Sequence, residues 1–570
     1  MSSSAPAVLV GRRQQWRVAE PTDPSPLAPL PALVAHLLRR RGIHDADEAR
    51  DFLNVSDSLF EDPGTLPDIE AAADRLALAR RRGETAAVYG DFDADGVTGT
   101  ALLVKALRRY GLRTLHYIPH RVSEGHGLNR NAVAKLHEQG AGLIVTVDCG
   151  VTNADETAYA GSLGVDVIIT DHHLATAALP RSVAIINPRA PHSRYAFDHL
   201  TGVGMTLKLA QAVLRPEFGD DWRTGLMELA AIGTITDMAP LFGENRYIVH
   251  HGIRDLQRTQ SVGLRALLDV ARITPEHANV ETLGFAIGPR LNAAGRLDHA
   301  DIALDLLLME DEAQAADLVR QLDDYNTQRR TLTDETLERA RGLVPAQAPP
   351  LILVGEPGFN PGVVGLVAGR LAEEFGTPCA VFAMDGDQVM GSCRSAPLFH
   401  WADALAQCGD LLFQYGGHAQ AAGFRCGVDV LPALQERLVS IAAERIGAAP
   451  VGREGVVDVE AQPHELMGPV FQGLRRMEPF GIGNPPPVFL ARGMEVLRAS
   501  EMGAEGKHFR LNVRSGGAIW EAVAFNQQWE SSVQQVDLVY TLDVDHWNGQ
   551  ERLRMTVKDH AASARPRLAL

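Results

Sequence analysis

Three alternating aspartates stand close together in the first quarter of the chain. Asp91, Asp93 and Asp95 lie in the segment GDFDADG, directly after the apolar run AAVYG and before a helical pattern. An apolar run of this kind is typical of a strand that is buried on both faces. One aspartate here would be explained as a turn or helix-cap residue. Three carboxylates at this spacing repel one another unless cations neutralise them, so the segment favours a divalent-metal site.

Further acids and histidines follow the next predicted strands. The run LIVTV is followed by Asp148, the run VDVIIT by the triplet DHH at 171–173, and an apolar helical run by Asp237. Each of these residues has an ordinary explanation as a turn, cap or packed residue when it is taken alone. Because the carboxyl ends of parallel strands meet at one edge of a sheet, where α/β folds bind ligands, their coincidence predicts a single site.

The residue types indicate which metal and which reaction this site would support. Aspartate and histidine without cysteine suit Mg²⁺ or Mn²⁺ better than zinc, and the imidazole favours Mn²⁺. Two such cations roughly 3.5–4 Å apart would activate a water and stabilise the attacking and leaving oxygens of an in-line displacement at phosphorus. Asp93 or Asp148 would be able to bridge them. The sequence therefore predicts a metal-dependent hydrolase of phosphodiester bonds.

The elements around these motifs predict an α/β protein of several domains. Four strands, at 86–90, 114–118, 143–147 and 165–170, alternate with helical stretches and indicate a doubly wound domain with a mostly parallel sheet. A long polar helix at 317–340 leads to a second α/β domain, and short alternating strands near the end predict a small β-barrel or sandwich. The expected division is 1–75, an extension that is partly disordered and then helical; 76–258, the metal-binding domain; 259–342, a helical connector; 343–448, the second α/β domain; and 449–570, the β-domain.

Composition sets wider bounds. The chain has 570 residues with 45% hydrophobic and 22% charged residues, which is typical of a globular protein of several domains. We expect no membrane span, no secretory signal and, with five cysteines and no CxxC pair, a cytoplasmic location. The net charge of −17 argues against a nucleic-acid partner, but a cluster of metal-binding carboxylates adds negative charge that cations cancel.

Taken in order, the motifs resemble those of a known family. GDFDADG, VDCG, DHH and Asp237 are similar to the motifs of the DHH phosphoesterase superfamily. RVSEGHGLN at 121–129 and PRLNAAGRLD at 289–298 resemble its RecJ branch. GFNPGVVGLVAGRLA, GSCRSAP and GGHAQAAG look like the accessory DHHA1 domain, and EPFGIGNPPPVF resembles the segment that opens an OB-type domain that binds nucleic acid.

This resemblance implies a 5′→3′ exonuclease that hydrolyses single-stranded DNA to 5′-mononucleotides in DNA repair and recombination, with two cations, Mn²⁺ or Mg²⁺. His173 would contact the scissile phosphate, and Asp171 would orient a neighbour. Asp91 would be a direct ligand or support one. The metal ligands that the resemblance implies are Asp91, Asp93, Asp95, Asp148, His172 and Asp237, and all of these except Asp91 join His173 as catalytic residues.

The resemblance also implies a site for the 5′-phosphate. Its residues would be Arg121, Arg296, Ser392, Arg394, Gly417 and His418. For each arginine, a surface ion pair is an equally good explanation. Asn360 stands where much of the family has histidine, so any role of that side chain is open.

In the last domain, Arg510 and Arg514 would share one face of a strand. The aromatic residues that are candidates for base stacking, although we expect most of them in the core, are Phe509, Trp520, Phe525 and Trp529.

Other functions remain open at this point. A DHH/DHHA1 hydrolase of oligoribonucleotides or cyclic dinucleotides would usually lack the OB-like segment, and a manganese pyrophosphatase would not need so many domains. A non-catalytic replication scaffold of the same fold should have lost ligand residues, whereas all of them are present here. The expected partners are single-stranded DNA with a 5′ end and, by resemblance, a single-stranded-DNA-binding protein and a helicase. We expect a monomer.

Overall fold

The computed structural model describes residues 8–12, 14–175, 179–191, 193–347, 349–395, 399–446, 454–503, 508–527, 529, 534–547 and 550–563. The chain forms two compact units. One spans Phe60–Val451, and the other combines Met1–Leu59 with Gly452–Leu570. Among the described residues, no helix has both the length and the apolar character needed to cross a bilayer.

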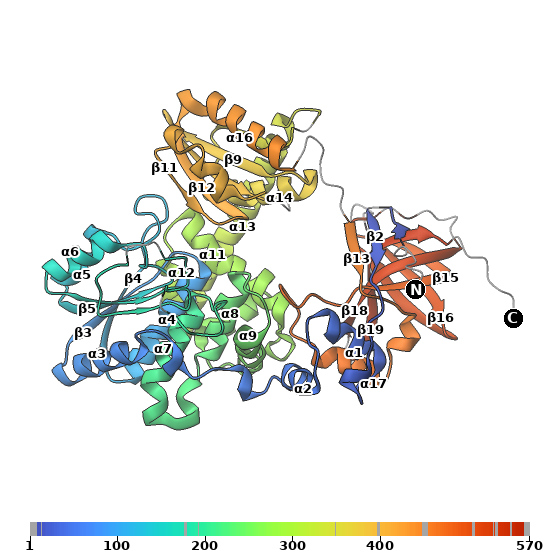
Figure 1. The fold of residues 1–570 in the computed structure, drawn as a ribbon, viewed down its shortest axis with the longest axis horizontal. Helices are drawn as coiled ribbons and strands as arrows, with labels where there is room; N and C mark the ends of the chain where they lie inside the picture. Colours follow the sequence, from blue (N-terminus) through green and yellow to red (C-terminus); the bar gives the residue numbers. More distant parts are fainter. Residues whose placement is uncertain are drawn as a thin grey trace. The chain divides into compact units, whose positions relative to one another are not determined.

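The first sheet of the larger unit is parallel throughout, and the doubly wound α/β prediction is confirmed (Figure 1). The four strands expected from the sequence are present, and a short fifth strand, which was not predicted, lies at one edge. In spatial order the strands are β4 (Arg113–Tyr117), β3 (Thr85–Tyr89), β5 (Ala141–Val147), β6 (Asp166–Thr170) and β7 (Ala184–Ile186).

Helices cover both faces of this sheet because its strands are apolar on both sides. Ala87 and Tyr89 of β3 pack into one core with α5 (Arg130–Glu138) and α6 (Ala154–Ser162). The alternating residues of β3 point to the opposite face. That face carries α3 (Ile69–Arg82), α4 (Ala94–Arg109) and α7 (Gly202–Phe218).

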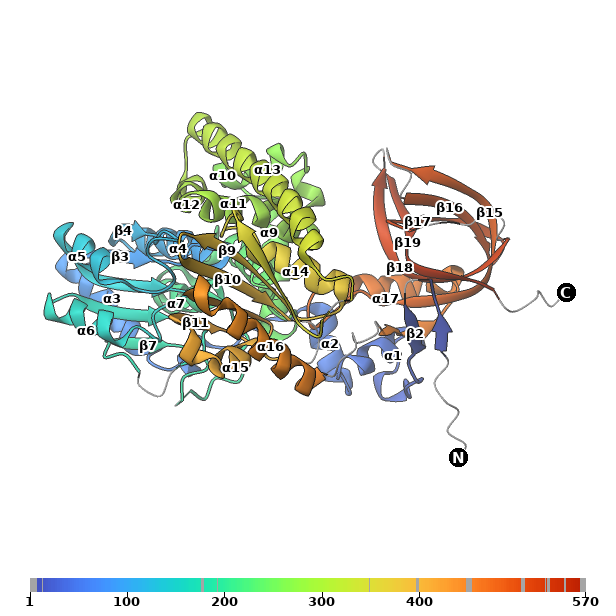
Figure 2. The same cartoon turned by 90° about the horizontal axis from the view of Figure 1, so that it is seen from above.

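A helical region connects this domain to the second sheet, as expected. Its last helix, α13, spans Glu312–Leu343 and is 32 residues long, a little more than the predicted range 317–340 (Figure 2). The preceding elements are α8 (Met227–Thr236), α9 (Gly243–Leu256), α10 (Val262–Val270), the π-helix η6 (Thr282–Ile287), α11 (Gly288–Leu297) and α12 (Asp301–Leu308).

The second sheet is mixed, since only β8 and β9 pair in parallel. Helix α14 (Val364–Phe375) packs on one face, and α15 (Trp401–Ala406) and α16 (Leu431–Ile446) pack on the other. Its strands in spatial order are β11 (Gln414–Gly417), β12 (Ala421–Gly427), β10 (Gln388–Arg394), β9 (Cys379–Asp385) and β8 (Ile352–Pro357).

The smaller unit contains the expected β-barrel. Five strands follow one another around it, and an additional pairing between β15 and β18 closes the ring (Figure 2). Closure removes exposed sheet edges. The strands are β15 (Phe489–Met502), β16 (His508–Ser515), β17 (Ala518–Ala524), β19 (Gln550–Ala562) and β18 (Gln535–Trp547), with β14 (Val459–Glu460) beside β15.

The start of the chain belongs to this barrel unit. Strand β2 (Gln15–Val18) pairs with β1 (Val8–Val10) and, in parallel, with β13 (Glu454–Val457). Helices α1 (Ala32–Arg40), α2 (Ala46–Asn54) and α17 (Pro469–Arg476) share the barrel core. The proline- and serine-rich residues 1–31 of the expected extension predict a poorly ordered or extended leader. Residues 1–7 and 13 of it lie outside the described residues, as do 448–453 of the linker predicted at 448–455.

Candidate metal centre and substrate pocket

The first aspartate motif connects β3 to α4. Asp93 caps α4, because its carboxylate accepts hydrogen bonds from the backbone N–H groups of Asp95 (3.0 Å) and Gly96 (3.1 Å). Asp95, in the first turn, accepts hydrogen bonds from the N–H groups of Gly202 (2.7 Å) and Val203 (3.0 Å) at the start of α7. The acidic loop is therefore held between the beginnings of two helices.

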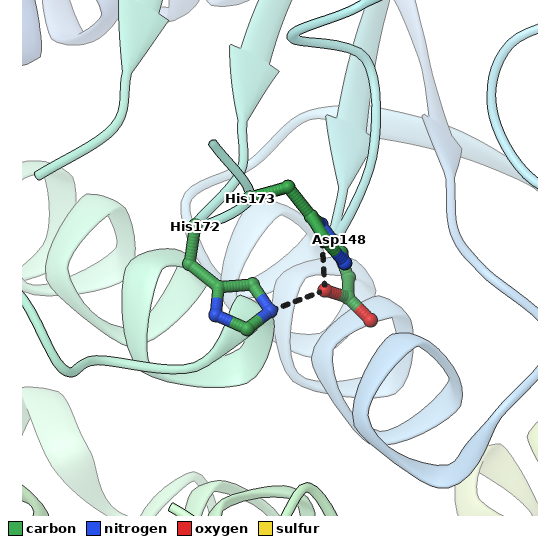
Figure 3. A group of neighbouring side chains, drawn as sticks. All are labelled: Asp148, His172 and His173. Atoms are coloured by element: carbon green, nitrogen blue, oxygen red, sulfur yellow. Dashed lines mark ion pairs between the residues drawn. The ribbon is translucent and has the colours of Figure 1, made fainter. Parts of the chain in front are cut away.

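Asp148 and the two histidines meet at the ends of β5 and β6. Asp148 has a left-handed backbone with φ +61°, and its Oδ1 lies 3.0 Å from Nε2 of His172 and 3.9 Å from Nδ1 of His173 (Figure 3). Asp237 caps the C-terminus of α8 at the rim of this group, with Oδ2 4.0 Å from Nε2 of His172. The predicted convergence at one sheet edge thus brings these side chains together.

The part of the chain that the structure describes contains three overlapping groups of aspartate and histidine side chains, and within each group the ligand atoms lie within 4.8 Å of one another. Together they include every residue that the sequence suggests as a ligand, and His173 as well. The groups are Asp91, Asp93 and Asp148; Asp95, His172 and Asp237; and Asp148, His172 and His173.

The electrostatics of this cluster suit divalent cations. Burial and the neighbouring Asp93 raise the pKa of Asp95 to about 7, and burial together with the surrounding carboxylates raises the pKa of Asp148. The Oδ1 atoms of Asp91 and Asp148 are buried and accept no hydrogen bond of regular geometry, and their nearest polar neighbours are imidazole nitrogens of His126 (3.2 Å) and His172 (3.0 Å). Burial and the neighbouring His173 lower the pKa of His172 to about 3, so its imidazole is neutral and has a lone pair to offer. Carboxylates suit both Mg²⁺ and Mn²⁺, and the neutral imidazole favours Mn²⁺.

Asp171 organises the histidine segment that follows β6. Its Oδ1 accepts hydrogen bonds from the backbone N–H groups of His172 (2.8 Å) and His173 (3.1 Å) and from Nδ1 of His173 (2.8 Å). Its Oδ2 accepts one from the N–H of Val151 (3.0 Å). Burial opposes the charge, but these bonds and the nearby imidazoles hold the pKa of Asp171 well below its usual range. Asp171 therefore fixes the ring of His173.

Three polar residues that sequence reasoning did not single out join the centre. Nδ1 of His126 lies 3.2 Å from Oδ1 of Asp91, and this contact outweighs burial and raises the pKa of His126 to about 9. Asn187 and Arg189, just after β7, hydrogen-bond to the carbonyls of His173 and His172. The last two follow the apolar run AII, which is too short to predict a strand from the sequence.

A cavity of about 460 Å³ lies beside the metal centre, between the two sheets of the larger unit. Arg121 and Ser392 line it from opposite domains. The guanidinium of Arg121 lies 4.1 Å above the ring of Phe92, and Nη1 of Arg394 donates to Oγ of Ser392 (3.2 Å). Arg296 donates to the carbonyl of Gly362 (3.1 Å).

Arg121, Arg296 and Arg394 lie close enough to influence one another, and Arg121 also senses the carboxylates of Asp91 and Asp93. Burial and the charges of Arg121 and Arg394 lower the pKa of Arg296 to about 9. Among the described residues, these three arginines bond to carbonyls, a hydroxyl and an aromatic face, and none forms an ion pair with a carboxylate. A group of unpaired guanidinium ions is suited to an anion such as phosphate.

Of the remaining candidate residues in the second domain, His418 lies at the metal centre, whereas Asn360 only stabilises a turn. His418 stacks on His173, with ring centroids 5.8 Å apart, and Gly417 precedes it at φ +128°. Asn360 lies in a turn, where its Oδ1 accepts a hydrogen bond from the N–H of Gly362 (2.8 Å).

In the barrel, most of the aromatic candidates are core residues. Trp520 is buried, and Phe509 and Trp529 pack against the same core, whereas Phe525 is 43% exposed. Arg510 and Arg514 point outward and pair with Glu521 (3.4 Å) and Glu495 (3.0 Å).

Comparisons with known proteins agree with this architecture. Family models match residues 85–234 (DHH family, N-terminal domain), 348–444 (DHHA1 domain) and 457–559 (RecJ OB domain). The chain is 35% identical over 571 residues to the single-stranded-DNA-specific exonuclease RecJ of Bacillus subtilis (strain 168), a match that covers 97% of this chain and 72% of that protein.

Solved structures give the same result. RecJ from Thermus thermophilus in complex with Mn²⁺ is 31% identical, with a TM-score of 0.82 over 97% of this chain and 80% of that one. Its complex with Mg²⁺ is 29% identical, with a TM-score of 0.76 over 96% and 78% of the two chains. The gathered acids and histidines, the three domain matches and the full-length similarity lead to one conclusion: the chain belongs to the RecJ family of single-stranded-DNA-specific exonucleases.

Proposed function

We propose that this chain hydrolyses single-stranded DNA from its 5′ end and releases 5′-mononucleotides, in DNA repair and recombination. The observation that carries the proposal is the position of the acidic centre beside a cavity lined by Arg121 and Ser392. Arg394 is hydrogen-bonded to that serine, and Arg296 is close enough to both arginines to sense their charges. The first arrangement suits hydrolysis at phosphorus, and the second suits capture of a terminal phosphate. Family membership supplies the direction and the strand preference.

Two divalent cations, Mn²⁺ or Mg²⁺, would be held by the carboxylates and His172. When bound, they would supply an activated water and neutralise the charge that develops at phosphorus. The ligands in this proposal are Asp93, Asp95, Asp148, His172 and Asp237, with Asp91 as a further ligand or as support that links His126 to the centre.

His173 has a different role in this proposal. Its Nδ1 is engaged by Asp171, so Nε2 is the ring atom left to face the scissile phosphate. With Nδ1–H donating to Asp171, the doubly protonated ring would also donate a hydrogen bond from Nε2–H to a phosphate oxygen, and this bond would strengthen as negative charge builds on that oxygen during the reaction. Stacking of His418 on the same ring would keep the imidazole in one orientation.

The 5′-phosphate would be bound by Arg121, Arg296 and Arg394, with Ser392 and the turn at Gly417 and His418. A cavity of about 460 Å³ is suited to a single nucleotide rather than a longer piece. With the terminal phosphate fixed there, the next phosphodiester bond would reach the acidic centre, so one nucleotide would leave at each step. A duplex end would be too wide to enter.

The proposal extends to the partners of the enzyme. A single-stranded-DNA-binding protein and a helicase would present the strand, and the enzyme would act as a cytoplasmic monomer. These points follow from the family resemblance and the cysteine usage.

A substrate panel tests the function. Purified protein is incubated with 5′-phosphorylated single strands, blunt duplexes, short RNA and cyclic dinucleotides, with Mn²⁺, Mg²⁺ or EDTA. We expect mononucleotides from the single strand alone, and no cleavage in EDTA. Faster cleavage of cyclic dinucleotides or RNA would overturn the choice of substrate, and a lack of any cation response would overturn the enzyme assignment.

A further inference from the structure

The segment that carries the two histidines is held from both sides of its backbone. We define residues 171–175 as the histidine loop. Asp171 binds the N–H groups of His172 and His173. The carbonyl groups of the same two residues are bound by a different element, the segment that follows the edge strand β7. The backbone of the loop is therefore engaged in both directions.

Asn187 and Arg189 make the carbonyl contacts. Nδ2 of Asn187, which is fully buried, donates to the carbonyl of His173 (2.9 Å), and its Oδ1 accepts from the N–H of Arg189 (2.7 Å). Nη1 of Arg189 donates to the carbonyl of His172 (3.1 Å). Each histidine carbonyl thus has its own side-chain donor, and the two donors are themselves linked.

The strand behind these donors is firmly anchored. The N–H of Asp171 donates to the carbonyl of Ile186 (3.1 Å), and the N–H of Ile185 donates to Oδ2 of Asp68 (3.0 Å) at the start of α3. Nε of Arg189 also donates to the carbonyl of Asp198 (3.0 Å). Because these contacts hold the strand and Arg189 in place, Asn187 and Arg189 can restrict the position of the histidine loop.

We propose that Asn187 and Arg189 are positioning residues of the metal centre. By holding the carbonyls of His173 and His172, they fix the direction in which the imidazoles leave the backbone, toward Asp148 and the cations. Groups that orient a ligand from behind commonly matter almost as much as the ligand itself. The inference rests on the proposed function only in that the centre must bind divalent cations.

The test uses the full chain and measures metal binding directly. The variants are Asn187→Ala, Arg189→Ala and Arg189→Lys, and the matched control is Arg194→Ala, an exposed arginine of the same segment. Calorimetric titration of Mn²⁺ into metal-free protein without DNA should show affinity weakened about ten- to a hundredfold by both alanine variants. Arg189→Lys should lie between them and the wild type, because it retains one donor. Arg194→Ala should bind as the wild type does.

Kinetics on single-stranded DNA separate positioning from substrate binding. We expect kcat to fall in Asn187→Ala and Arg189→Ala while KM for DNA stays within about twofold of wild type, since neither residue has been placed at the substrate pocket. Millimolar guanidinium should restore part of the Mn²⁺ affinity of Arg189→Ala, which a merely structural defect would not allow. Wild-type Mn²⁺ affinity in both alanine variants, or an equal loss in Arg194→Ala, would overturn the proposal.

If Arg189→Ala melts much lower than wild type in EDTA, Arg189→Lys decides, and wild-type Mn²⁺ affinity in that variant counts against the proposal. If the wild-type protein binds Mn²⁺ but leaves single-stranded DNA intact, the proposed function fails, while the weakened Mn²⁺ binding of the variants still supports the positioning role.

Discussion

Asp95 and Asp148 are buried among other carboxylates, and this arrangement opposes folding when no cation is present. Burial and mutual repulsion raise the pKa of both groups, which means that the folded protein disfavours their charged forms. Bound divalent cations reverse the sign of this interaction. A large part of the stability of the larger unit should therefore depend on the metal.

Replacing Asp148 with asparagine tests whether the buried carboxylate destabilises the metal-free protein and binds the metal. Asp148→Asn retains the shape of the side chain, and asparagine tolerates the left-handed backbone at φ +61°. Because a buried charge is removed, the melting temperature in EDTA should stay the same or rise, whereas the increase caused by Mn²⁺ should shrink. Cleavage should fall at least about a hundredfold, since a metal ion contributes several kcal/mol to such reactions.

The matched control is Asp155→Asn, which changes an exposed aspartate on α6. Thermal melts with and without Mn²⁺, run beside an exonuclease assay, provide the measurement. Undiminished stabilisation by Mn²⁺ in Asp148→Asn would mean that Asp148 is not a ligand.

Ser392 should help the enzyme to prefer a strand with a 5′-phosphate over a strand with a 5′-hydroxyl group. Its Oγ lies 3.2 Å from Nη1 of Arg394 and lines the cavity. A hydrogen bond to a charged group contributes roughly 1.5 kcal/mol or more, which is about tenfold in affinity. Ser392→Ala should therefore raise KM about tenfold for a 5′-phosphorylated strand and little for a 5′-hydroxyl strand. Steady-state kinetics on both strands measure this, with the exposed Ser162→Ala as control. Equal changes on both strands would place Ser392 outside the phosphate site.

Single residues differ in how well their contacts could be predicted from the sequence. The proposed ligands follow predicted strands or sit in a dense motif, so that topology alone brings them near one another. Asn187 and Arg189 lie 14 and 17 residues from the histidines that they contact, across a loop whose path no local pattern reveals. His126 was part of a motif, but nothing in the motif indicated that Asp91 would be its partner.

At the scale of elements, the close approach of α7 to the end of β5 shapes the metal centre. A Cβ atom at Gly202, the first residue of α7, would lie 2.3 Å from Cβ of Asp148. Since the N–H of Gly202 also binds Asp95, the helix cannot simply move away. The glycine is thus required for space and not for an unusual backbone angle.

Gly202→Ala should accordingly displace Asp148 without unfolding the domain. We expect Mn²⁺ affinity and cleavage to fall about ten- to a hundredfold, as for other disturbances of metal-ligand orientation. Gly161→Ala, in α6, is the matched control because a Cβ there meets nothing within 4 Å. Alanine is the better helix former by up to about 1 kcal/mol, so this control should be neutral or stabilising. Calorimetric titration of Mn²⁺ into both variants measures the effect. Wild-type Mn²⁺ affinity in Gly202→Ala would show that the space at this glycine does not control the position of Asp148.

Elements with a strong apolar pattern were predictable, and short ones were not. The four predicted strands agree with β3, β4, β5 and β6 within about two residues. Three of them, β3, β5 and β6, are continuous or nearly continuous apolar runs, and β4 mixes apolar and polar residues. Strand β7 has three residues, too few to show any period, and it forms because β6 offers it a parallel partner. Missing this strand concealed the two residues that hold the histidine loop.

At the scale of the whole molecule, the chain begins and ends in the same unit. Gln15 pairs with Glu454, and Asp559 of β19 accepts hydrogen bonds from the N–H of Arg12 (3.0 Å) and from Nε1 of Trp16 (2.9 Å). Contacts across more than 400 residues leave no trace in local sequence patterns. For this reason, the extension expected over 1–75 gave no sign of a partner, whereas the first two helices contribute buried residues to the barrel core.

Leu37 in α1 tests whether the start of the chain is integral to the barrel unit. It is fully buried in one core with Leu538 and Tyr540 of β18. Leu37→Ala should lower the free energy of unfolding of this unit by about 2–5 kcal/mol, the usual result of truncating a buried leucine. Calorimetric melts should show the barrel transition at lower temperature, while the transition stabilised by Mn²⁺ stays in place, because the metal centre belongs to the other unit.

The comparison variant is Leu497→Ala, which makes the same truncation at a leucine that is 38% exposed on β15. Exposed substitutions rarely change stability by more than about 0.5 kcal/mol. Equal effects of the two variants would remove α1 from the core. A fragment of residues 449–570 provides a second test, since it lacks β2, α1 and α2. If this fragment melts like the barrel of the full chain, α1 is not part of the core. If instead the fragment fails to fold and adding residues 1–59 restores it, the two ends of the chain form one cooperative domain.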